Sequence, residues 1–366
     1  MSAKPSAQPD IHLFEPTGYA GVFQHTCRLA QALSQRGLTV TLHTGHEHEP
    51  VDLAGVRICS CVWWPMPRDT SRPKVLMRKA AITAGLVART VPHLIHAGSG
   101  AVLHVQGVSA SGAVNLLLLA AARRAGSRVV YSPHDVFSRR GALDEFLLRI
   151  GYRRPHAMVV YSDADARILA KSGVAAHVSP LVQLVPPPTA LQRRIWRREW
   201  GAHDSDTVVL FTGFIRPEKR VDVLVESAAT WPPDRRLAVV GPDRGGWARC
   251  DALARTHLVD IAARLEFVEL TEFTAAIAAA DVVVVPSEQA SQSGVLAVAR
   301  QLRTPTVAAD IGGMGELASH TFTAGDPGDL NRAIQKALGG GAPPAPSPRD
   351  LDEAVAVHLS AYGVRS

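Results

Sequence analysis

The chain has 366 residues, of which 46% are hydrophobic and 20% charged, and its formal net charge is +6. This length favours two domains, and the composition allows a substantial core built mainly from Ala, Val and Leu. The longest apolar stretch, around 114–122, falls well short of the roughly 20 residues that span a bilayer, which excludes a membrane-spanning helix. A basic chain suits anionic partners such as sugar nucleotides, anionic lipids or nucleic acid, although Arg-rich chains are often basic without one.

The first half of the chain alternates strand and helix patterns. Ile11–Phe14 is a short strand, 16–21 a loop punctuated by glycine, and 22–36 an amphipathic helix. With a strand at 38–42 these segments open as a βαβ unit. Further strands are predicted at 102–105, 129–131 and 157–161, and helices at 113–124 and 163–171.

Three consecutive prolines at 186–188 interrupt this pattern, because proline lacks an N–H donor and has a fixed φ. The alternation then restarts. The predicted strands are 207–211, 236–240, 265–268, 282–285 and 306–308, the last clear strand, and the predicted helices are 221–229, 271–280, 294–302 and 351–361.

We therefore predict an N-terminal domain at 1–188 and a C-terminal domain at 189–345. The remaining residues, 346–366, should form a helix that packs back toward the N-terminal domain. Both domains should be doubly wound α/β folds.

Two segments of the C-terminal half carry features that bind phosphate. Residues 211–219, Phe-Thr-Gly-Phe-Ile-Arg-Pro-Glu-Lys, place a glycine turn, Arg216 and Lys219 directly after a strand. Residues 291–294, Ser-Gln-Ser-Gly, open an apolar helix, whose first backbone amides carry partial positive charge. Two such devices in one α/β domain indicate a diphosphate ligand, which we expect to be a nucleotide.

The chain resembles the retaining glycosyltransferases of family 4 (group 1), which have the GT-B fold of two Rossmann-like domains facing across a cleft. Three motifs carry the resemblance. They are the segment 211–228 with its glycine turn and Lys219, the segment 280–297 with Ala-Ser-Gln-Ser-Gly at 290–294, and the run Thr-Pro-Thr-Val-Ala-Ala-Asp-Ile-Gly-Gly-Met-Gly-Glu at 304–316. The N-terminal half matches more loosely, through the loop at 18–21 and the strand that ends at His134.

The resemblance implies transfer of a sugar from a nucleoside diphosphate to a hydroxyl, with retention of the anomeric configuration. Lys219 and Arg216 would stabilise the departing diphosphate, and His134 would lie beside the donor sugar. The implied donor-binding residues are Gly21, Gly213, Glu288, Gln289, Ser291, Gln292, Ser293 and Gly294. Gly18 and Tyr19 would belong to the acceptor loop, Asp135 would have a supporting role, and Glu316 either contacts the ligand or caps a helix.

The expected co-substrate is a UDP-, GDP- or dTDP-sugar, with no bound cofactor. No metal is expected, because protein cations would neutralise the diphosphate. The acceptor would be a sugar, a lipid-linked sugar or a small molecule, in bacterial glycan, glycolipid or natural-product biosynthesis. Neither the donor sugar and base nor the acceptor can be named from the sequence.

The sequence departs from the family at several positions. Members commonly have two glutamates whose slots here are occupied by Ala290 and Val298. Gln289 or Glu288 could replace the one near the sugar, and nothing obvious replaces the one near the ribose. Phe214 stands at the place of the usual Arg after the glycine turn, and Arg220 at the place of the glycine after the Lys.

Other functions remain open at this point. These departures would also fit a non-catalytic relative that binds a sugar nucleotide, and the fold group includes sugar-nucleotide epimerases and phosphorylases. Nucleic-acid binding would rest on the basic charge alone, since no recognised motif for it is present. The individual residues also have structural interpretations: turn glycines at 18 and 21, helix caps at Ser291 and Ser293, and a loop histidine at 134.

Basic residues suggest a peripheral contact with an anionic membrane. The segment 192–200, Gln-Arg-Arg-Ile-Trp-Arg-Arg-Glu-Trp, could lie on a membrane surface, but we favour a helix with Ile195 and both Trp rings packed inward. A second basic region consists of Arg72, Lys74, Arg78, Lys79 and Arg89.

The histidines and cysteines show no clear metal motif. His43, His46 and His48, together with Glu47 and Glu49, suggest a metal tract, although we favour a solvated loop after a strand. The four cysteines lack paired metal spacing, and Cys59-Ser-Cys61 alone is a weak signal. Sparse cysteine and a polar N-terminus without a signal-peptide core predict a cytoplasmic protein. Such a protein could also bind peripherally to the inner face of the membrane.

Overall fold

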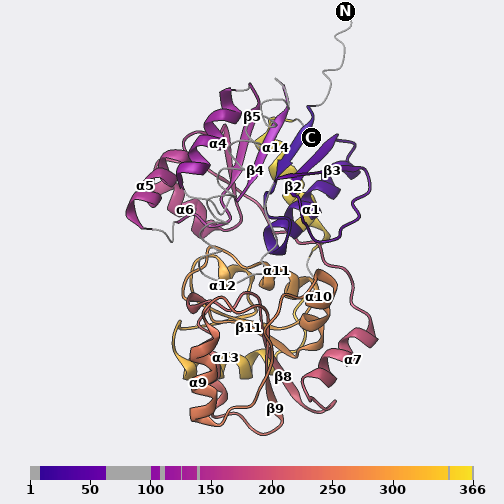
Figure 1. The fold of residues 1–366 in the computed structure, drawn as a ribbon, viewed down its shortest axis with the longest axis vertical. Coiled ribbons are helices and arrows are strands. Elements are labelled where there is room, and N and C mark those ends of the chain that lie inside the picture. Colours follow the sequence, from indigo (N-terminus) through magenta and orange to yellow (C-terminus); the bar gives the residue numbers. More distant parts are fainter. Residues whose placement is uncertain are drawn as a thin grey trace, which may run out of the picture. The chain divides into compact units, whose positions relative to one another are not determined.

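The computed structural model describes residues 9–62, 100–107, 112–124, 126–137, 141–344 and 347–364. Its internal contacts divide the chain into two units (Figure 1), the first formed by Met1–Gln183 with Pro348–Ser366 and the second by Leu184–Ser347. The sequence places these boundaries after residues 188 and 345. The functional roles of the two units remain predictions.

The first unit contains a seven-stranded sheet in the order β3-β2-β1-β4-β5-β6-β7, with every pair parallel. The strands are β1 (Ile11–Phe14), β2 (Val40–Gly45), β3 (Val56–Val62), β4 (Val102–Gln106), β5 (Arg128–Ser132), β6 (Ala157–Val160) and β7 (His177–Val178). The described helices are α1 (Ala20–Gln35), α4 (Gly112–Arg124), α5 (Ala142–Gly151), α6 (Asp163–Lys171) and α14 (Pro348–Tyr362).

Helices cover both faces of this sheet. Side chains alternate along a strand, so Leu103 and Val105 of β4 lie on one face, where they pack in a cluster with α4, α5 and α6. His104 and Gln106 therefore lie on the opposite face, where His104 contacts Tyr362 of α14. In Figure 1 the yellow α14 lies among the indigo and magenta elements of the first unit, although it is the last helix of the chain.

The second unit contains a six-stranded parallel sheet in the order β10-β9-β8-β11-β12-β13. Its strands are β8 (Thr207–Thr212), β9 (Arg235–Val240), β10 (Ile261–Arg264), β11 (Val282–Val285), β12 (Thr306–Ala309) and β13 (His320–Phe322). Its helices are α7 (Ala190–Glu199), the short 3-10 helix η2 (Pro217–Lys219), α8 (Val221–Ala228), α9 (Trp247–His257), α10 (Leu270–Ala279), α11 (Gly294–Gln301), α12 (Met314–Leu317) and α13 (Pro327–Gly339).

Each face of the second sheet has its own hydrophobic cluster. Val209 and Phe211 of β8 point into the cluster formed with α8, α9 and α13. Val208 and Leu210 point into the other cluster, formed with α7, α10 and α11. Strands buried on both faces read as continuous apolar runs, which is why β8 and β11 could be predicted from sequence.

Several predicted elements differ from the structure. The strand expected at 265–268 is wrong, because β9 pairs with Ile261–Arg264 instead. The strand at Thr306 is not the last, since the short β13 pairs with β12. Helix α1 begins at Ala20 rather than at 22, so Gly21 lies within its first turn and not in the loop. Short edge strands carry too few apolar residues to be recognised by period alone.

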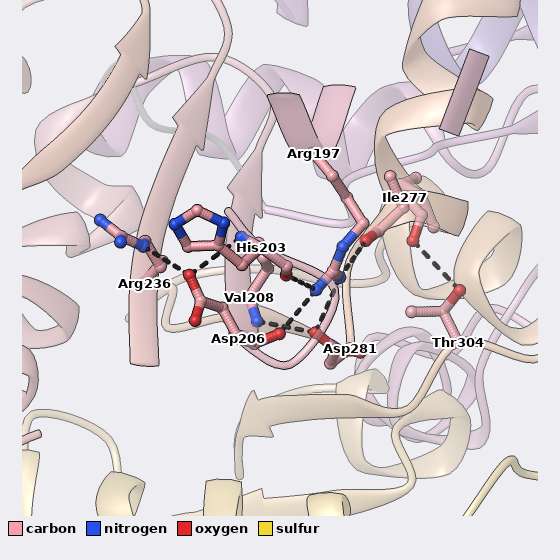
Figure 2. Close-up of polar contacts among 9 residues, drawn as sticks. Arg197, His203, Asp206, Val208, Arg236, Ile277, Asp281 and Thr304 are labelled. Atoms are coloured by element: carbon pink, nitrogen blue, oxygen red, sulfur yellow. Dashed lines mark hydrogen bonds and ion pairs between the residues drawn. The ribbon is translucent and has the colours of Figure 1, made fainter. Parts of the chain in front are cut away.

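The basic helix α7 packs against the second sheet and is fixed there by polar contacts (Figure 2). Trp196 and Trp200 are 3% and 4% exposed, as the packing interpretation predicted, but Ile195 is 52% exposed, so its predicted inward packing is wrong. The Arg197 guanidinium donates to the Asp281 carboxylate at 3.1 Å and to the backbone oxygens of Ala279, His203 and Asp206. The second basic region, at 72–89, lies outside the described residues.

Candidate functional site

The sheet order of the second unit creates a switch point between β8 and β11. The chain leaves β8 for its neighbour β9 and leaves β11 for β12 on the other side, so the connections diverge. Ligands of doubly wound folds bind in the crevice outside the carboxyl ends of such strands. The loops that follow β8 and β11, residues 213–220 and 286–293, contain both phosphate-binding segments predicted from sequence.

Backbone contacts with the neighbouring loop after β9 hold the first of these loops in place. The Gly213 amide donates to the Val240 oxygen, and the Ile215 amide to the Pro242 oxygen, both at 3.0 Å. A Cβ at Gly241 would lie 2.0 Å from the Gly213 oxygen, and Gly241 has a φ of 142°, so only glycine fits there. The turn that presents Arg216 and Lys219 is thus rigidly supported.

Arg216 and Lys219 lie at the start and the end of a short helical turn. Arg216 precedes η2, its guanidinium carbon lies 5.2 Å from the centre of the Phe214 ring, and Arg244 approaches the same ring at 5.8 Å. Phe214, the departure from the family's usual Arg, therefore carries two guanidinium groups on its ring. Lys219 ends η2, and its amide donates to the Arg216 oxygen at 2.9 Å.

Arg220 joins the two loops. Its φ of 51° is left-handed, a conformation that favours glycine, which is the residue that the family resemblance leads us to expect here. The Arg220 guanidinium pairs with Asp222 at 3.1 Å and with Glu288 at 3.0 Å, and the Glu288 amide donates to the Glu218 oxygen at 3.0 Å. The structure thus places the Glu288 carboxylate, a predicted donor-binding group, in an ion pair that bridges the loops.

Helix α11 begins at the end of the second loop. Ser293 is its N-cap and accepts from the Leu296 amide at 3.4 Å. Gly294 opens the helix, and the first amides of any helix have no acceptor within it. The buried Ser291 accepts through its backbone oxygen from the Gly313 amide, which ties the loop to the segment before α12. Gln289 is exposed, Gln292 is half-buried in the same loop, and Glu316 is exposed in the first turn of α12.

Two hydroxyl groups at this edge of the sheet were missed by sequence reasoning. The Thr212 and Ser287 side-chain oxygens are buried and have no hydrogen-bond partner among the described residues. Thr212 is the last residue of β8 and Ser287 lies two residues after β11, and a hydroxyl residue at the carboxyl end of a strand could have been noticed as a signal. A ligand that reached them would satisfy groups that the protein leaves unsatisfied.

The two positions where the family resemblance leads us to expect glutamate are apolar in the structure. Ala290 is 7% exposed and Val298 is 1% exposed. Val298 packs in the hydrophobic cluster beneath α11 and offers no charge to a ligand. Ala290 and Val298 therefore cannot make the ligand contacts that the resemblance assigns to the two glutamates.

In the first unit, two buried carboxylates organise the loop after β1. Glu15 accepts from the Thr17 hydroxyl, from the Thr17 amide at 3.1 Å and from the Gly18 amide at 2.8 Å. Glu49 accepts from the Ala20 amide at 2.8 Å. Gly18 has a φ of 77°, and a Cβ there would lie 2.7 Å from the Glu47 oxygen, so this position needs glycine. Tyr19 is the N-cap residue of α1.

Glu15 has an unusual protonation equilibrium. Burial raises the pKa of Glu15 from 4.5 to about 7, although the hydrogen bonds from Thr17, Gly18 and Thr44 act in the opposite direction. The loop thus depends on a carboxyl that changes its charge near neutral pH. Neither Glu15 nor Glu49 was predicted as a site residue, and the solvated loop expected at 43–49 is wrong for His43 and Glu49, which are both buried.

His134 follows β5, where its ring is fixed on three sides. Its Nε2 lies 2.8 Å from the Gln106 side-chain oxygen, which can only accept, so Nε2 carries the proton. The ring stacks on Tyr161 at 4.9 Å and meets His25 edge-on at 5.4 Å. Burial, with His25 and His358 nearby, lowers the pKa of His134 well below its usual value, so the imidazole is neutral at pH 7. Asp135 is exposed beside it.

A layer of buried polar side chains continues from His134 beneath α14. It contains His25, His104, Ser132, Tyr161, His358 and Tyr362. His104 contacts the Tyr362 hydroxyl at 2.8 Å and the Ser132 hydroxyl at 2.9 Å. Burial lowers the pKa of His25 to about 3 and that of His358 to about 4, so both stay neutral. No sequence pattern predicted this layer, since its members are scattered along the whole first unit.

Comparison with known proteins agrees with this geometry. Residues 206–339 match the family profile described as glycosyl transferases group 1, and residues 19–193 match that of glycosyltransferase family 4. D-inositol 3-phosphate glycosyltransferase 2 of Catenulispora acidiphila is 34% identical over 39% of this chain, and D-inositol 3-phosphate glycosyltransferase of Mycobacterium bovis is 36% identical over 33%. The matched regions span only 37% and 26% of those two relatives.

A solved structure shares the fold over nearly the whole chain. Anabaena Alr3699/HepE in complex with UDP-glucose superimposes with a TM-score of 0.67, covers 97% of this chain and 96% of its own, and is 16% identical. The fold is therefore GT-B, as predicted, with two parallel-sheet α/β units. Within the described residues, no helix is both long and apolar enough to cross a membrane.

Proposed function

Since the chain belongs to the group 1 glycosyltransferases of family 4, we propose that it is a retaining, metal-independent transferase. It would move a sugar from a nucleoside-diphosphate sugar to a hydroxyl acceptor. The observation that supports this most directly is the pair of joined loops at the β8/β11 switch point. They combine Arg216, Lys219 and the N-terminus of α11 at one edge of the second sheet.

The chemistry follows from where charge develops. As the bond between sugar and diphosphate breaks, negative charge accumulates on the leaving group. Lys219 and Arg216 would stabilise that charge more in the transition state than in the ground state, and the first amides of α11 would assist. Because these groups already supply positive charge, we propose that no divalent ion is needed. Addition of a metal chelator should therefore leave turnover unchanged.

His134 would act as a neutral hydrogen-bonding group. Since Nε2–H is engaged by Gln106, the imidazole is oriented by the protein and brings no charge of its own to the donor sugar. Gly18 and Tyr19 would shape the acceptor loop, and the first turn of α1, with Gly21, would approach the donor. Asp135 and Glu316 would have supporting roles.

The relatives suggest which ligands to test first. The UDP-glucose complex of the Anabaena protein makes UDP-sugars the first donors to test, followed by GDP- and dTDP-sugars. The D-inositol 3-phosphate glycosyltransferases make phosphorylated polyols reasonable acceptors beside sugars and lipid-linked sugars. Peripheral contact with an anionic membrane remains part of this proposal only for a lipid-linked acceptor.

The first experiment is a thermal-shift screen of the purified protein against UDP, GDP, dTDP and ADP and their sugar conjugates. A ligand that binds only the folded state raises the melting temperature. With the donor so identified, Lys219→Ala should lower kcat by about 10²–10³-fold, the usual effect of removing one stabilising group. The exposed Lys336→Ala on α13 is the matched control and should retain full turnover.

One observation favours a second candidate, a non-catalytic relative that binds sugar nucleotides. Ala290 and Val298 are buried apolar residues at both glutamate slots. That candidate predicts a thermal shift with a nucleoside diphosphate but no transfer or donor hydrolysis with any acceptor. Turnover that falls about 10²–10³-fold in Lys219→Ala would exclude it.

A further inference from the structure

A cluster of two thiols and an imidazole lies at the outer edge of the first sheet. Cys59 and Cys61 stand on β3, the edge strand, and His43 on its neighbour β2, where it is the register partner of Cys59. The register between β2 and β3 shifts by one residue after this pair, and the shift still leaves both sulfurs close to a His43 ring nitrogen. The sequence pattern Cys-Ser-Cys was a weak signal because His43 is distant in the chain.

The separation between the Cys61 sulfur and a His43 nitrogen matches that of a tetrahedral metal site. The Cys59 and Cys61 sulfurs and a His43 ring nitrogen all lie within 4.8 Å of one another. The Cys61 Sγ and the His43 Nδ1 are 3.7 Å apart. In a tetrahedral site with Zn–S of about 2.3 Å and Zn–N of about 2.1 Å, sulfur and nitrogen are separated by about 3.6 Å.

A second histidine fixes the orientation of His43. The His43 Nε2 lies 2.9 Å from the His12 Nδ1, and the two rings stack with centres 5.2 Å apart. If His43 donates its Nε2–H to His12, its Nδ1 carries a lone pair directed at Cys61. Metal-binding histidines commonly donate their second ring N–H to such a partner, which sets the tautomer.

We propose that His43, Cys59 and Cys61 bind a thiophilic divalent metal ion of the zinc class. Two thiolates and one imidazole are ligands typical of Zn²⁺, and three protein ligands leave the fourth tetrahedral position for solvent or a small ligand. His43 is 4% exposed and the two cysteines are half-buried, so the ligands are held firmly yet an ion can enter.

A Cys59–Cys61 disulfide explains the cluster less well. A disulfide would give no role to His43 and His12. The metal site is independent of the proposed transferase activity, because it uses none of the residues assigned to the donor or acceptor.

The test is titration of the reduced, metal-free protein with Co²⁺, which reports thiolate ligation and tetrahedral geometry by absorption. We expect one Co²⁺ per chain, a thiolate-to-cobalt charge-transfer band in the near ultraviolet and strong visible d–d bands, all lost when Zn²⁺ is added. His12→Phe preserves the ring stacking but removes the acceptor, and should weaken affinity by about 10–100-fold.

Variants of the four cysteines supply the controls. Cys59→Ser/Cys61→Ser should abolish the charge-transfer band, whereas Cys27→Ala/Cys250→Ala, which leaves only the two proposed ligands, should keep it. Zn²⁺ should raise the melting temperature of the wild type and of the second variant only. Absence of the band from the wild type would overturn the proposal even if the double serine variant failed to fold. So would its survival in a folded Cys59→Ser/Cys61→Ser variant.

Discussion

The first connection of each sheet holds a side chain in a left-handed backbone conformation. Ala20 has a φ of 61° at the start of α1, and Arg220 has a φ of 51° before α8. L residues avoid this region because Cβ approaches the following carbonyl oxygen. Leu258 and Arg303 share it at other places, so the conformation by itself does not mark a site. At Ala20 it coincides with a part-buried hydrogen bond from the Ala20 amide to Glu49, and at Arg220 with ion pairs to Asp222 and Glu288.

Ala20→Gly should stabilise the protein. Glycine removes a conformational strain of about 1–2 kcal/mol and makes the unfolded chain more flexible by about 0.5–1 kcal/mol, so a net gain of about 0.5–1 kcal/mol is expected. Thermal denaturation measures the change. Ala30→Gly, in the middle of α1 and fully buried, is the control and should lower the melting temperature. A loss of stability in Ala20→Gly as well would show that Ala20 is not strained.

Glu15 predicts a pH dependence of stability. Between pH 4.5 and about 7 the folded chain keeps a proton on Glu15 that the unfolded chain has released, so stability falls as pH rises through this window. The loss is up to about 3 kcal/mol, and Glu15→Gln should not show it. Urea denaturation at pH 5 and pH 8 should find the variant gaining that amount relative to the wild type.

The exposed Glu47→Gln, in the same segment, serves as the control for this pH effect. Its stability relative to the wild type should not change between the two pH values. An equally flat difference for Glu15→Gln would mean that the four hydrogen bonds outweigh burial and keep Glu15 ionised in the folded chain.

At the scale of elements, α7 shows how a basic segment is used for packing. Arg197 connects this helix to the loop after it and to the start of β11 through four hydrogen bonds to four residues (Figure 2). Asp281 also accepts from the Val208 amide at 2.7 Å, which fixes the start of β8. The guanidinium of Arg197 is therefore used for contacts within the protein.

Arg197→Met should destabilise the second unit by about 2–4 kcal/mol. Methionine preserves the apolar stem but removes the donor to three backbone oxygens and to Asp281, which would keep only the Val208 amide. Arg194→Met on the exposed face of the same helix should have almost no effect. Differential scanning calorimetry measures both. Equal melting temperatures for the two variants would contradict the role given to Arg197.

At the scale of the whole molecule, the first unit is built from two separate parts of the chain. Helix α14 follows the entire second unit in sequence but packs in the first, where Ala354, Val355 and Tyr362 are fully or almost fully buried. Tyr362 reaches His104 at 2.8 Å, and the Ala361 oxygen accepts from Arg128 at 2.9 Å. The stability of the first unit therefore depends on the end of the chain.

Deletion of residues 348–366 should unfold the first unit and spare the second. The deletion exposes an apolar face and leaves His104 without the Tyr362 hydroxyl. Limited proteolysis with mass spectrometry should then find protected fragments only within 184–347. The milder Tyr362→Phe should lower stability by about 1–2 kcal/mol. Protection of fragments from 9–62 after the deletion would refute this dependence.

Local patterns account for what could be predicted of the fold and of the site. The buried strands β8 and β11, the Ser293 cap and the loop with Arg216 and Lys219 are encoded in short windows of sequence. The weak edge strands β10 and β13 were missed, because their few apolar residues do not show a period. The functional roles of Lys219, Arg216 and His134 remain predictions.

The sequence by itself determined the class of fold, the two α/β units and the segments that could bind a diphosphate, because periodicity, capping and turn residues act over a few neighbours. Only the tertiary structure decided which polar groups are buried and with which partners. It paired Arg220 with Glu288, placed Glu15 and Glu49 beneath the loop at 16–20, and brought His43 to Cys59 and Cys61. Burial and charge pairing depend on residues far apart in the chain. A local sequence pattern cannot show which of these residues come into contact.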